Sequence, residues 1–405
     1  MQGFEDINVN SYFINKLNER YIKNPTGIQQ LVIPKLMEGK SILFRSATGT
    51  GKTFAYLLPV LQLIEEKKQG PAILIAAPTL ELCSQIKNEV EFLLPDIKPM
   101  LLIGSASIDK QIETLKRQKP LIVIGNPGRL FALAKMGKLK LNLLSFLILD
   151  EADRLTVQEC LEDTTGLLSI IKRETGRRNP EAPRLQVIGC SATVGKKTYE
   201  QLGVLFKDAE LAESEDHEIL RDQIKHWAIF SEKRKKTQTL RSLLAAINNQ
   251  TGKSKKSKIK ILVFTGKNDD AALIYSRLVH HKIAAAALIG KVNKKPVTAE
   301  DRKAALDSFR NGSVQVLVAT DLAARGLDIR GVTHVVALDV PADGEFYIHR
   351  AGRTGRAGKS GIMITIGDET QMRLLASLEK KLKIKITPKE LYGGRISEID
   401  FQEEH

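Results

Sequence analysis

The stretch Ser46-Ala47-Thr48-Gly49-Thr50-Gly51-Lys52-Thr53 decides the fold of the first half of this chain. An apolar run, Ser41-Ile42-Leu43-Phe44, precedes it and is typical of a short buried strand, while Phe54-Ala55-Tyr56-Leu57-Leu58 after it is typical of the start of a helix. A strand, a glycine-rich turn and a helix, in this order, form the context that a phosphate-binding loop requires. We therefore expect the N–H groups of the turn and the positive end of the helix dipole to face one anion.

Two side chains of this stretch predict what the loop binds. Lys52 is placed to reach the β- and γ-phosphates of a nucleoside triphosphate, and the Thr53 hydroxyl is a suitable Mg²⁺ ligand. Ser46 stands where the general pattern begins with glycine, and a small residue is compatible with that position. A flexible Gly-Thr loop without a ligand is the alternative, but the flanking strand and helix favour the phosphate site.

Length, net charge and cysteine spacing each exclude some classes of protein. The chain has 405 residues, which exceeds one compact core and predicts two or three domains. Its net charge of +15 favours a polyanionic partner such as nucleic acid over a basic surface that serves only solubility. Cys83, Cys160 and Cys190 stand far apart, which indicates buried thiols in a reducing, cytoplasmic setting rather than disulfides or structural zinc. No apolar run has the length of a membrane span, and the first residues lack a signal-peptide pattern.

Apolar runs alternate with helical patterns after the phosphate loop. The run at residues 72–77 is followed by Pro78 and Thr79, and the runs at residues 121–124, 145–149 and 185–190 are followed directly by glycine or a polar residue. Continuous apolar strands of this kind are covered on both faces, as in a parallel sheet. The fold class that we expect is therefore α/β, a doubly wound parallel sheet with its site at the carboxyl edge.

A carboxylate cluster, Asp150-Glu151-Ala152-Asp153, follows the expected strand at residues 145–149. An aspartate at a strand end beside a phosphate loop is suited to hold Mg²⁺, directly or through water. Glu151 is suited to act as a general base toward the attacking water. A solvated acidic turn is the alternative, and it is disfavoured by the preceding apolar strand and the upstream Gly-Lys-Thr.

The second half repeats the α/β pattern. Strands are expected at residues 224–230, 259–265, 314–319, 333–338 and 362–366, with helices between them. We place a first domain at residues 1–211, a linker at residues 212–218 and a second domain at residues 219–405. Because the second half has no Gly-Lys-Thr of its own, one nucleotide between two similar domains is the expected arrangement.

The order Gln29, Gly-Thr-Gly-Lys-Thr, Asp-Glu-Ala-Asp and Ser191-Ala192-Thr193 resembles the DEAD-box RNA helicases, and the likeness covers nearly the whole chain. The resemblance implies two tandem RecA-like domains that use ATP and Mg²⁺ to separate short RNA duplexes or remodel RNA–protein complexes. It also implies that Gln29 selects adenine. Ser191 and Thr193 would couple the nucleotide state to the RNA state through Asp153.

The resemblance also assigns RNA contacts, mostly to the phosphate backbone. In the first half, the matching positions are Pro78, Thr79, Glu81, Gly128 and Arg129, although Leu80 stands where arginine is usual. In the second half, the matching RNA positions are Thr320 and Arg325, with Asp328 on the ribose. Ala299 stands where glutamine is usual.

The segment His349-Arg350-Ala351-Gly352-Arg353-Thr354-Gly355-Arg356 resembles the arginine-finger motif of the same family. By this match Arg353 and Arg356 face the γ-phosphate, and His349 takes part in coupling the two domains. Such a finger typically raises turnover by about 10³ to 10⁵, because it neutralises the transferring phosphoryl group. An ordinary basic helix end is the alternative.

Two other functions stay open at this point. An ATP-gated RNA clamp with little unwinding is one, kept open by the Leu80 and Ala299 positions; a DNA helicase is the other, which the Gln29 motif disfavours. The basic segments at residues 172–180 and 251–258 are expected to be surface loops, with solvation favoured over an auxiliary RNA contact.

Overall fold

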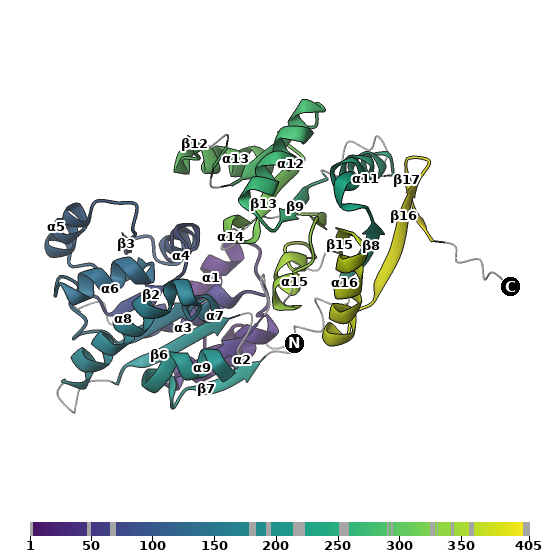
Figure 1. The fold of residues 1–405 in the computed structure, drawn as a ribbon. Helices are drawn as coiled ribbons and strands as arrows, with labels where there is room; N and C mark the ends of the chain where they lie inside the picture. The colour runs from purple at the N-terminus through teal and green to yellow at the C-terminus, as the bar shows by residue number, and fades with distance from the viewer. Residues whose placement is uncertain are drawn as a thin grey trace. The chain divides into compact units, whose positions relative to one another are not determined.

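The computed structural model describes residues 3–46, 50–64, 70–177, 184–191, 196–213, 223–250, 259–289, 291–292, 295–324, 329, 331–341, 344–355 and 360–399. The chain divides into two compact units, Met1–His217 and Glu218–His405. Each unit holds one large sheet with helices on its faces (Figure 1).

The sheet of the first unit has seven strands in the order β3-β4-β2-β5-β6-β1-β7, and its neighbouring strands run parallel. The strands are β1 (Ile42–Arg45), β2 (Ile73–Ala76), β3 (Met100–Leu102), β4 (Ile122–Gly125), β5 (Phe146–Asp150), β6 (Gln186–Ser191) and β7 (Glu210–Glu213). The helices are η1 (Glu5–Ile7), α1 (Ser11–Glu19), α2 (Gly27–Met37), α3 (Lys52–Leu63), α4 (Leu80–Leu93), α5 (Ile108–Gln118), α6 (Pro127–Lys135), α7 (Ala152–Leu155), α8 (Gln158–Gly176), α9 (Lys196–Leu202) and η2 (Gly203–Phe206).

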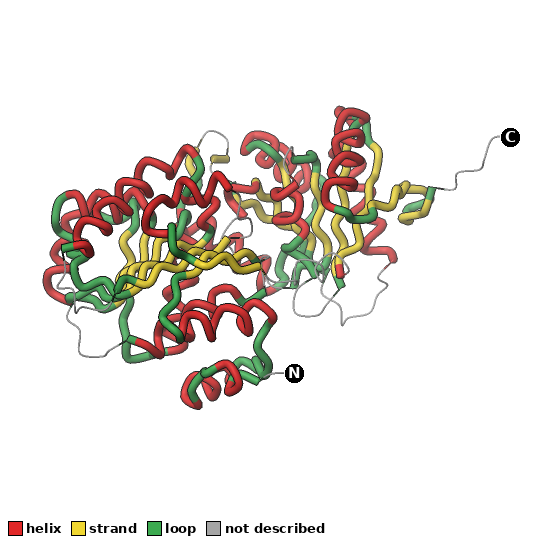
Figure 2. Tube along the Cα trace, turned by 90° about the horizontal axis from the view of Figure 1, so that it is seen from below, coloured by secondary structure: helices red, strands yellow, loops and turns green. Residues whose placement is uncertain are grey.

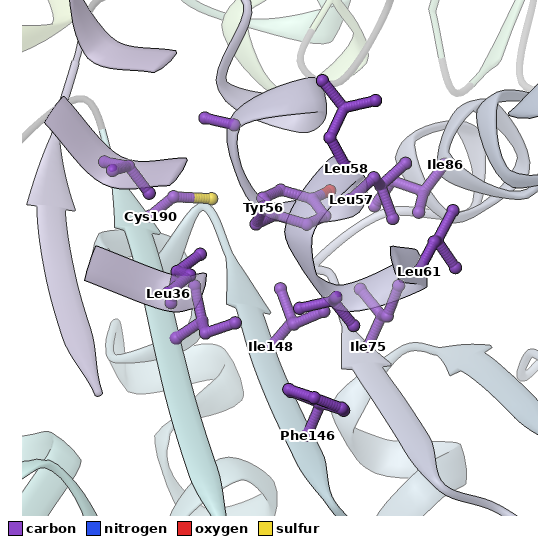
Figure 3. Packing of buried hydrophobic residues seen from close by; sticks show 14 of the residues in the cluster. Leu36, Tyr56, Leu57, Leu58, Leu61, Ile75, Ile86, Phe146, Ile148 and Cys190 are labelled. Carbon is purple, nitrogen blue, oxygen red and sulfur yellow. The ribbon is translucent and has the colours of Figure 1, made fainter. Parts of the chain in front are cut away.

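Alternate residues of these strands pack into two different cores, as the two-residue period of a strand requires. Ile73 and Ile75 of β2 join one buried cluster, while Leu74 between them joins the other. Helices α2, α3 and α4 supply apolar side chains to the first cluster, and α6 and α8 supply them to the second. Figure 2 shows helices on both sides of the strand layer of this unit, and Figure 3 shows the first cluster from close by. The expected double winding is confirmed.

Several residues that the sequence predicts to bind or react lie at the carboxyl edge of this sheet. Strand β6 lies between β5 and β1, and the register pairs Asp150 with Cys190 and Arg45 with Ser191. The ends of these three strands therefore meet at one place, where the phosphate loop, the carboxylate cluster and Ser191 begin or end. This is the edge at which open α/β sheets bind their ligands.

The sheet of the second unit has eight strands in the order β10-β13-β9-β14-β15-β8-β16-β17. The strands are β8 (Ile224–Phe230), β9 (Ile261–Thr265), β10 (Ala285–Leu288), β13 (Val316–Thr320), β14 (His334–Ala337), β15 (Gly361–Gly367), β16 (Ile386–Tyr392) and β17 (Arg395–Glu398), beside a small ribbon of β11 (Lys291–Val292) and β12 (Lys295–Pro296). The helices are η3 (Lys233–Lys235), α11 (Lys236–Gln250), α12 (Asn268–His280), α13 (Ala299–Asn311), α14 (Asp321–Ala324), α15 (Gly344–Ala351) and α16 (Glu369–Leu382).

The second unit also has one core on each face of its sheet. Helices α11 and α12 pack on one face, and α13, α15 and α16 pack on the other. The strands from β10 to β16 run parallel, and only the last pair, β16 with β17, is antiparallel. The two doubly wound sheets confirm the expected fold class.

Two expectations about connecting segments need correction. Ala212 and Glu213 lie in β7, which pairs with β1, so a linker begins no earlier than residue 214. Residues 172–176, expected in a basic loop, form the last turns of α8, whose Leu167, Leu168 and Ile171 are buried in the core. The basic residues 251–258 lie outside the described residues.

Within the described residues, no helix is both long and apolar enough to cross a bilayer.

Candidate nucleotide and RNA site

The phosphate loop is fixed at its start by contacts of Ser46. The Ser46 N–H donates to the Ser191 carbonyl over 3.0 Å, and the Ser46 and Thr50 hydroxyls share a hydrogen bond. Ser46 is fully buried, so this position holds a small polar residue between β1 and β6. Ala47, Thr48 and Gly49 lie outside the described residues. Lys52 and Thr53 open α3, where the free N–H groups of a helix favour an anion.

Gln29 of α2 fixes the end of the same loop. Its amide nitrogen donates to the Gly51 carbonyl over 3.0 Å, and its amide oxygen accepts from the Thr26 N–H over 3.0 Å. A primary amide has two donors and two acceptor sites, so one of each remains for a ligand such as adenine. Gly51 has φ +89°, and a Cβ there would lie 2.5 Å from the Gln29 nitrogen. Glycine is therefore required at position 51 on two counts.

Asp150 ends β5 and is buried, with 4% of its surface exposed. One carboxylate oxygen accepts from the Glu151 N–H over 2.9 Å and from the Cys190 thiol over 3.0 Å. The other accepts from the Tyr56 hydroxyl over 2.8 Å. Three protein donors thus fix the position of this carboxylate.

Tyr56 lies one helical turn after Thr53 and contacts Asp150, the other residue that we expect at the metal. Its buried hydroxyl donates to the Asp150 carboxylate. Burial, then the Asp150 charge, raises the pKa of Tyr56 and that of Cys190 well above their ordinary values, so both stay protonated as donors. Figure 3 shows Tyr56 and Cys190 side by side in the core. Sequence reasoning missed Tyr56, although its place one helical turn after Thr53 is a signal that could have found it.

This donor set fits Mg²⁺. The cation prefers oxygen ligands and keeps several of its waters, and the edge supplies the Thr53 hydroxyl and the Asp150 carboxylate. Because both Asp150 oxygens already accept bonds from the protein, contact through water suits the site better than direct ligation.

Glu151 follows Asp150 in a conformation that side chains rarely adopt. Its φ is +53°, in the left-handed region, and it precedes α7 as the N-cap. Glu151 is buried, with 9% of its surface exposed. A non-glycine residue held in this region stores strain, and such residues cluster at functional sites. The turn therefore orients Glu151 at the carboxyl edge at an energetic cost.

Two of the residues expected to couple the nucleotide state to the RNA state lie beside this turn. Ser191 ends β6 and is fully buried, and Asp153 is half-buried in α7. The carboxylate of Asp153 accepts from the Arg154 N–H over 3.0 Å. Thr193 lies outside the described residues.

The first of the expected RNA segments caps α4. The Thr79 hydroxyl accepts from the Leu82 N–H over 3.2 Å, so Thr79 is the N-cap of the helix. Pro78 and Glu81 are half-buried beside it, and so is Leu80. The segment directly follows β2, at the same edge of the sheet as Asp150.

Arg129 of α6 holds a neighbouring loop together. Its guanidinium donates to the carbonyls of Ala106 and Gly104, both over 3.0 Å, and to the Gln111 side chain over 2.8 Å. An arginine has five N–H donors, so some remain for a phosphate. The three bonds to the neighbouring loop give Arg129 a positioning role that the sequence did not predict.

The neighbouring Gly128 has little room for a side chain, because a Cβ there would approach the Asp163 carboxylate to 2.9 Å.

In the second unit, Arg350 is a buried cation held by four hydrogen bonds, and the sequence analysis gave it no role. Its guanidinium makes two bonds to the Asp321 carboxylate, over 2.8 and 2.7 Å, and two to Asp339, over 2.9 and 3.0 Å. Only 2% of Arg350 is exposed, and Phe264 lies under the guanidinium. This network ties α15 to the ends of β13 and β14.

The other expected residues of the second unit lie around this network. Thr320 ends β13, is buried, and accepts from the Ala323 N–H over 3.3 Å. His349 is half-buried in α15, and Arg353 follows the helix with 5% of its surface exposed. Arg325, Asp328 and Arg356 lie outside the described residues.

Comparison with known proteins decides the family. Residues 26–202 match the DEAD/DEAH box helicase family, and residues 235–358 match the helicase conserved C-terminal domain. The chain is 34% identical to a Bacillus cereus protein named DEAD-box ATP-dependent RNA helicase CshC, over 93% of this chain and 90% of that one. It is 30% identical to a Bacillus subtilis protein named probable ATP-dependent RNA helicase YfmL, over 96% and 97% of the two chains. The chain is a DEAD-box helicase.

Two solved structures have a fold similar to that of this DEAD-box chain. S. cerevisiae Dbp5 bound to RNA and ADP BeF3 covers 96% of both chains at a TM-score of 0.81 and 24% identity. Mss116p bound to ssRNA and AMP-PNP matches 96% of this chain and 80% of its own, at a TM-score of 0.80 and 23% identity. Two RecA-like domains, as the resemblance implied, are therefore confirmed.

Within the first unit, the structure brings Gln29, Ser46, Asp150, Glu151 and Ser191 of the DEAD-box motifs to one sheet edge. In the second unit it connects the motif at Thr320 and Asp321 to the motif at His349 and Arg350 through the Arg350 network.

Proposed function

We propose that this DEAD-box protein is an RNA-stimulated ATPase that uses ATP to separate short RNA duplexes or remodel RNA–protein complexes. Its relatives are named ATP-dependent RNA helicases, and the chain covers 90% or more of the first two. The observation that carries the proposal is the joint anchoring of the phosphate loop. Gln29 holds one end of the loop and the Ser191 carbonyl holds the other, beside the buried Asp150.

In this proposal, the first domain cradles the triphosphate. The N–H groups of residues 46–53 and the start of α3 bind the phosphates, Lys52 binds the β- and γ-phosphates, and Gln29 reads adenine with its remaining donor and acceptor. Thr53 and Asp150 would hold Mg²⁺, which neutralises charge that develops on the transferring phosphoryl group. Glu151 would take a proton from the attacking water, in the orientation fixed by its left-handed backbone.

The second domain would complete the ATP site. Arg353 and Arg356 would face the γ-phosphate, and Asp328 would bind the ribose. The proposed domains are residues 1–213, ending with β7, and residues 219–405. ATP and RNA would each favour closure of the two domains, so each ligand would tighten the binding of the other. Asp153, Ser191, Thr193 and His349 would relay this coupling.

RNA would lie along the segments that follow the strands. The proposed contacts are Pro78, Thr79, Glu81, Gly128, Arg129, Thr320 and Arg325. Helix N-termini and arginines bind phosphate oxygens without reading bases. Binding should therefore weaken steeply with salt and show little sequence preference. The three cysteines carry no disulfide, in keeping with a reducing compartment, and we propose the cytoplasm.

One variant tests the ATP site. Lys52→Ala should abolish RNA-stimulated ATP hydrolysis, because the phosphate cradle loses its cation, while exposed Lys110→Ala, a control with the same charge change on α5, should keep it. Turnover of the Lys52 variant at the normal rate would refute the site.

Strand displacement tests the remaining alternatives with the unaltered protein. A helicase should release the shorter strand with ATP at low enzyme concentration, whereas an ATP-gated clamp would bind RNA with a non-hydrolysable analogue and release no strand. Equal stimulation of the ATPase by single-stranded DNA would favour a DNA helicase.

A further inference from the structure

The outer surface of the second unit carries a basic pocket between α11 and α12, both labelled in Figure 1. The pocket has a volume of about 650 Å³ and is open to solvent. The residues that matter for its chemistry are Arg234, Thr237, Arg241, Ser242, Arg277 and His281. We call it the α11–α12 pocket. None of the residues assigned above to ATP or RNA lines it.

The arginines of this pocket are poorly neutralised. The lining contains three arginines and a histidine, and no carboxylate among the described residues. Arg277 donates to the Thr237 hydroxyl over 3.0 Å, which leaves most of its donors available. Among the described residues, no hydrogen bond or ion pair engages the half-buried Arg241. Within the part of the chain that the structure describes, Arg234 alone of the three arginines has a carboxylate partner, Glu232, at 2.9 Å.

The pKa of His281 is consistent with this excess of positive charge. Loss of hydration, then the charges of Arg241 and His280, lowers the pKa of His281 from its ordinary value. A histidine beside an ion-paired arginine would feel less repulsion, because the carboxylate would offset the charge. The three lining arginines, with no carboxylate among the described lining residues, give the pocket a positive field that favours an anion.

We propose that the α11–α12 pocket binds backbone phosphates of RNA that extends beyond the strand held by the helicase motifs. The inference rests on the RNA binding proposed above. Guanidinium groups match phosphate oxygens in a bidentate geometry, and the Thr237 and Ser242 hydroxyls supply further donors. Arg241 lies on α11 and Arg277 on α12, with Arg234 in η3, so the cations are spread along an open pocket. This arrangement suits a chain of phosphates better than one small ion. The pocket would increase the affinity for long RNA without selecting a sequence.

The test compares a short RNA, just long enough to stimulate ATP hydrolysis, with an RNA several times longer. In the variant Arg241→Gln with Arg277→Gln, the affinity for the long RNA should fall about tenfold or more at moderate salt. The slope of log affinity against log salt should also fall by about 1.4 for long RNA, since each phosphate contact contributes about 0.7 for a single strand. The affinity for the short RNA and its stimulation of the ATPase should stay unchanged.

A matched control removes the same charge elsewhere in the second unit. Arg373→Gln with Lys380→Gln alters two cationic side chains of α16, which packs on the opposite face of the sheet from α11 and α12. This control should bind long RNA as the unaltered protein does. An equal loss in both variants would overturn the proposal, because net charge alone would then explain it. So would an equal loss for both RNA lengths, or no loss at all.

A competition experiment determines whether the ligand of the α11–α12 pocket is RNA or a free polyanion. Inorganic tripolyphosphate should compete with long RNA only at concentrations far above those of RNA phosphate. If it instead bound the Arg241 and Arg277 pair tightly and long RNA did not, the pocket would be a small-anion site and the proposal would be wrong. Failure of the helicase assignment would appear separately, as loss of ATPase stimulation by the short RNA.

Discussion

At the scale of single residues, the site depends on side chains held in costly or restricted states. Glu151 occupies left-handed backbone space, and Gly51 adopts a φ of +89° against the Gln29 amide. Asp150 is held in a buried place by three protein donors. These features fix the geometry before any ligand arrives, which is the condition for electrostatic catalysis.

Glu151→Gln tests the general base. The amide keeps the size and backbone conformation of the side chain but is not a base, so RNA-stimulated hydrolysis should fall about 10²- to 10⁴-fold. ATP and RNA binding, measured by fluorescence titration, should stay close to normal. If nucleotide binding disappeared together with turnover, Glu151 would be part of the binding site and not the base.

Tyr56→Phe tests the bond between Tyr56 and Asp150. Loss of one hydroxyl should raise the Mg²⁺ concentration that half-saturates nucleotide binding about fivefold, the effect of roughly 1 kcal/mol. Tyr347→Phe is the control, because Tyr347 is equally buried and bonds His226 in the other unit. An unchanged Mg²⁺ requirement in the Tyr56 variant would show that the hydroxyl does not position the metal site.

At the scale of elements, strands with continuous apolar runs could be predicted from the sequence, whereas elements rich in alanine or in charged residues could not. The strands at Ile73–Ala76 and Phe146–Asp150 stand out in the sequence because both of their faces are buried. Strand β10, Ala285–Leu288, consists mostly of alanine and gives no such signal. The basic end of α8 was expected to be a loop, because charge hid the helical spacing of Leu167, Leu168 and Ile171.

The site shows the same division. The positions of Lys52 at the start of a helix and of Asp150 and Glu151 at a strand end were predictable from the apolar runs before them, while their roles stay predictions. Tyr56 and Arg350 were missed because their roles depend on partners far away in the chain, Asp150 and Asp339 among them. Only the fold brings such partners together.

The contact between β8 and α15 should make the second unit sensitive to acid. Burial lowers the pKa of His226 to about 4, and its Nδ1 lies 3.1 Å from the Tyr347 hydroxyl. Between pH 6.5 and 4 the unfolded chain binds a proton that the folded unit does not, so stability falls as the pH falls through this range. A shift of this size corresponds to about 3 kcal/mol.

His226→Gln should remove that part of the acid sensitivity, because the amide stays neutral. Thermal unfolding at pH 7 and pH 4.5 checks this, with the exposed His280→Gln as control. His334, whose pKa burial also lowers to about 4, should keep the remaining sensitivity in both variants. The same loss of stability in His226→Gln and the unaltered protein would contradict the assignment.

At the scale of the whole molecule, we assign different parts of one proposed reaction to the two units. The first has the phosphate loop and the carboxylates, and the second has the motif of Arg350 and Arg353 on a network of buried ion pairs. In the proposed reaction neither set is sufficient, because the transferring phosphoryl group would need the arginines of the second unit in addition to Lys52 and Mg²⁺. The central claim is that both units serve one ATP molecule.

Single-turnover ATP hydrolysis by Arg353→Ala at saturating RNA tests this claim most directly, with thermal unfolding to confirm that the variant is folded. The account predicts that turnover falls about 10³- to 10⁵-fold while ATP binding stays close to normal. A folded variant that hydrolyses ATP at the normal rate would contradict it.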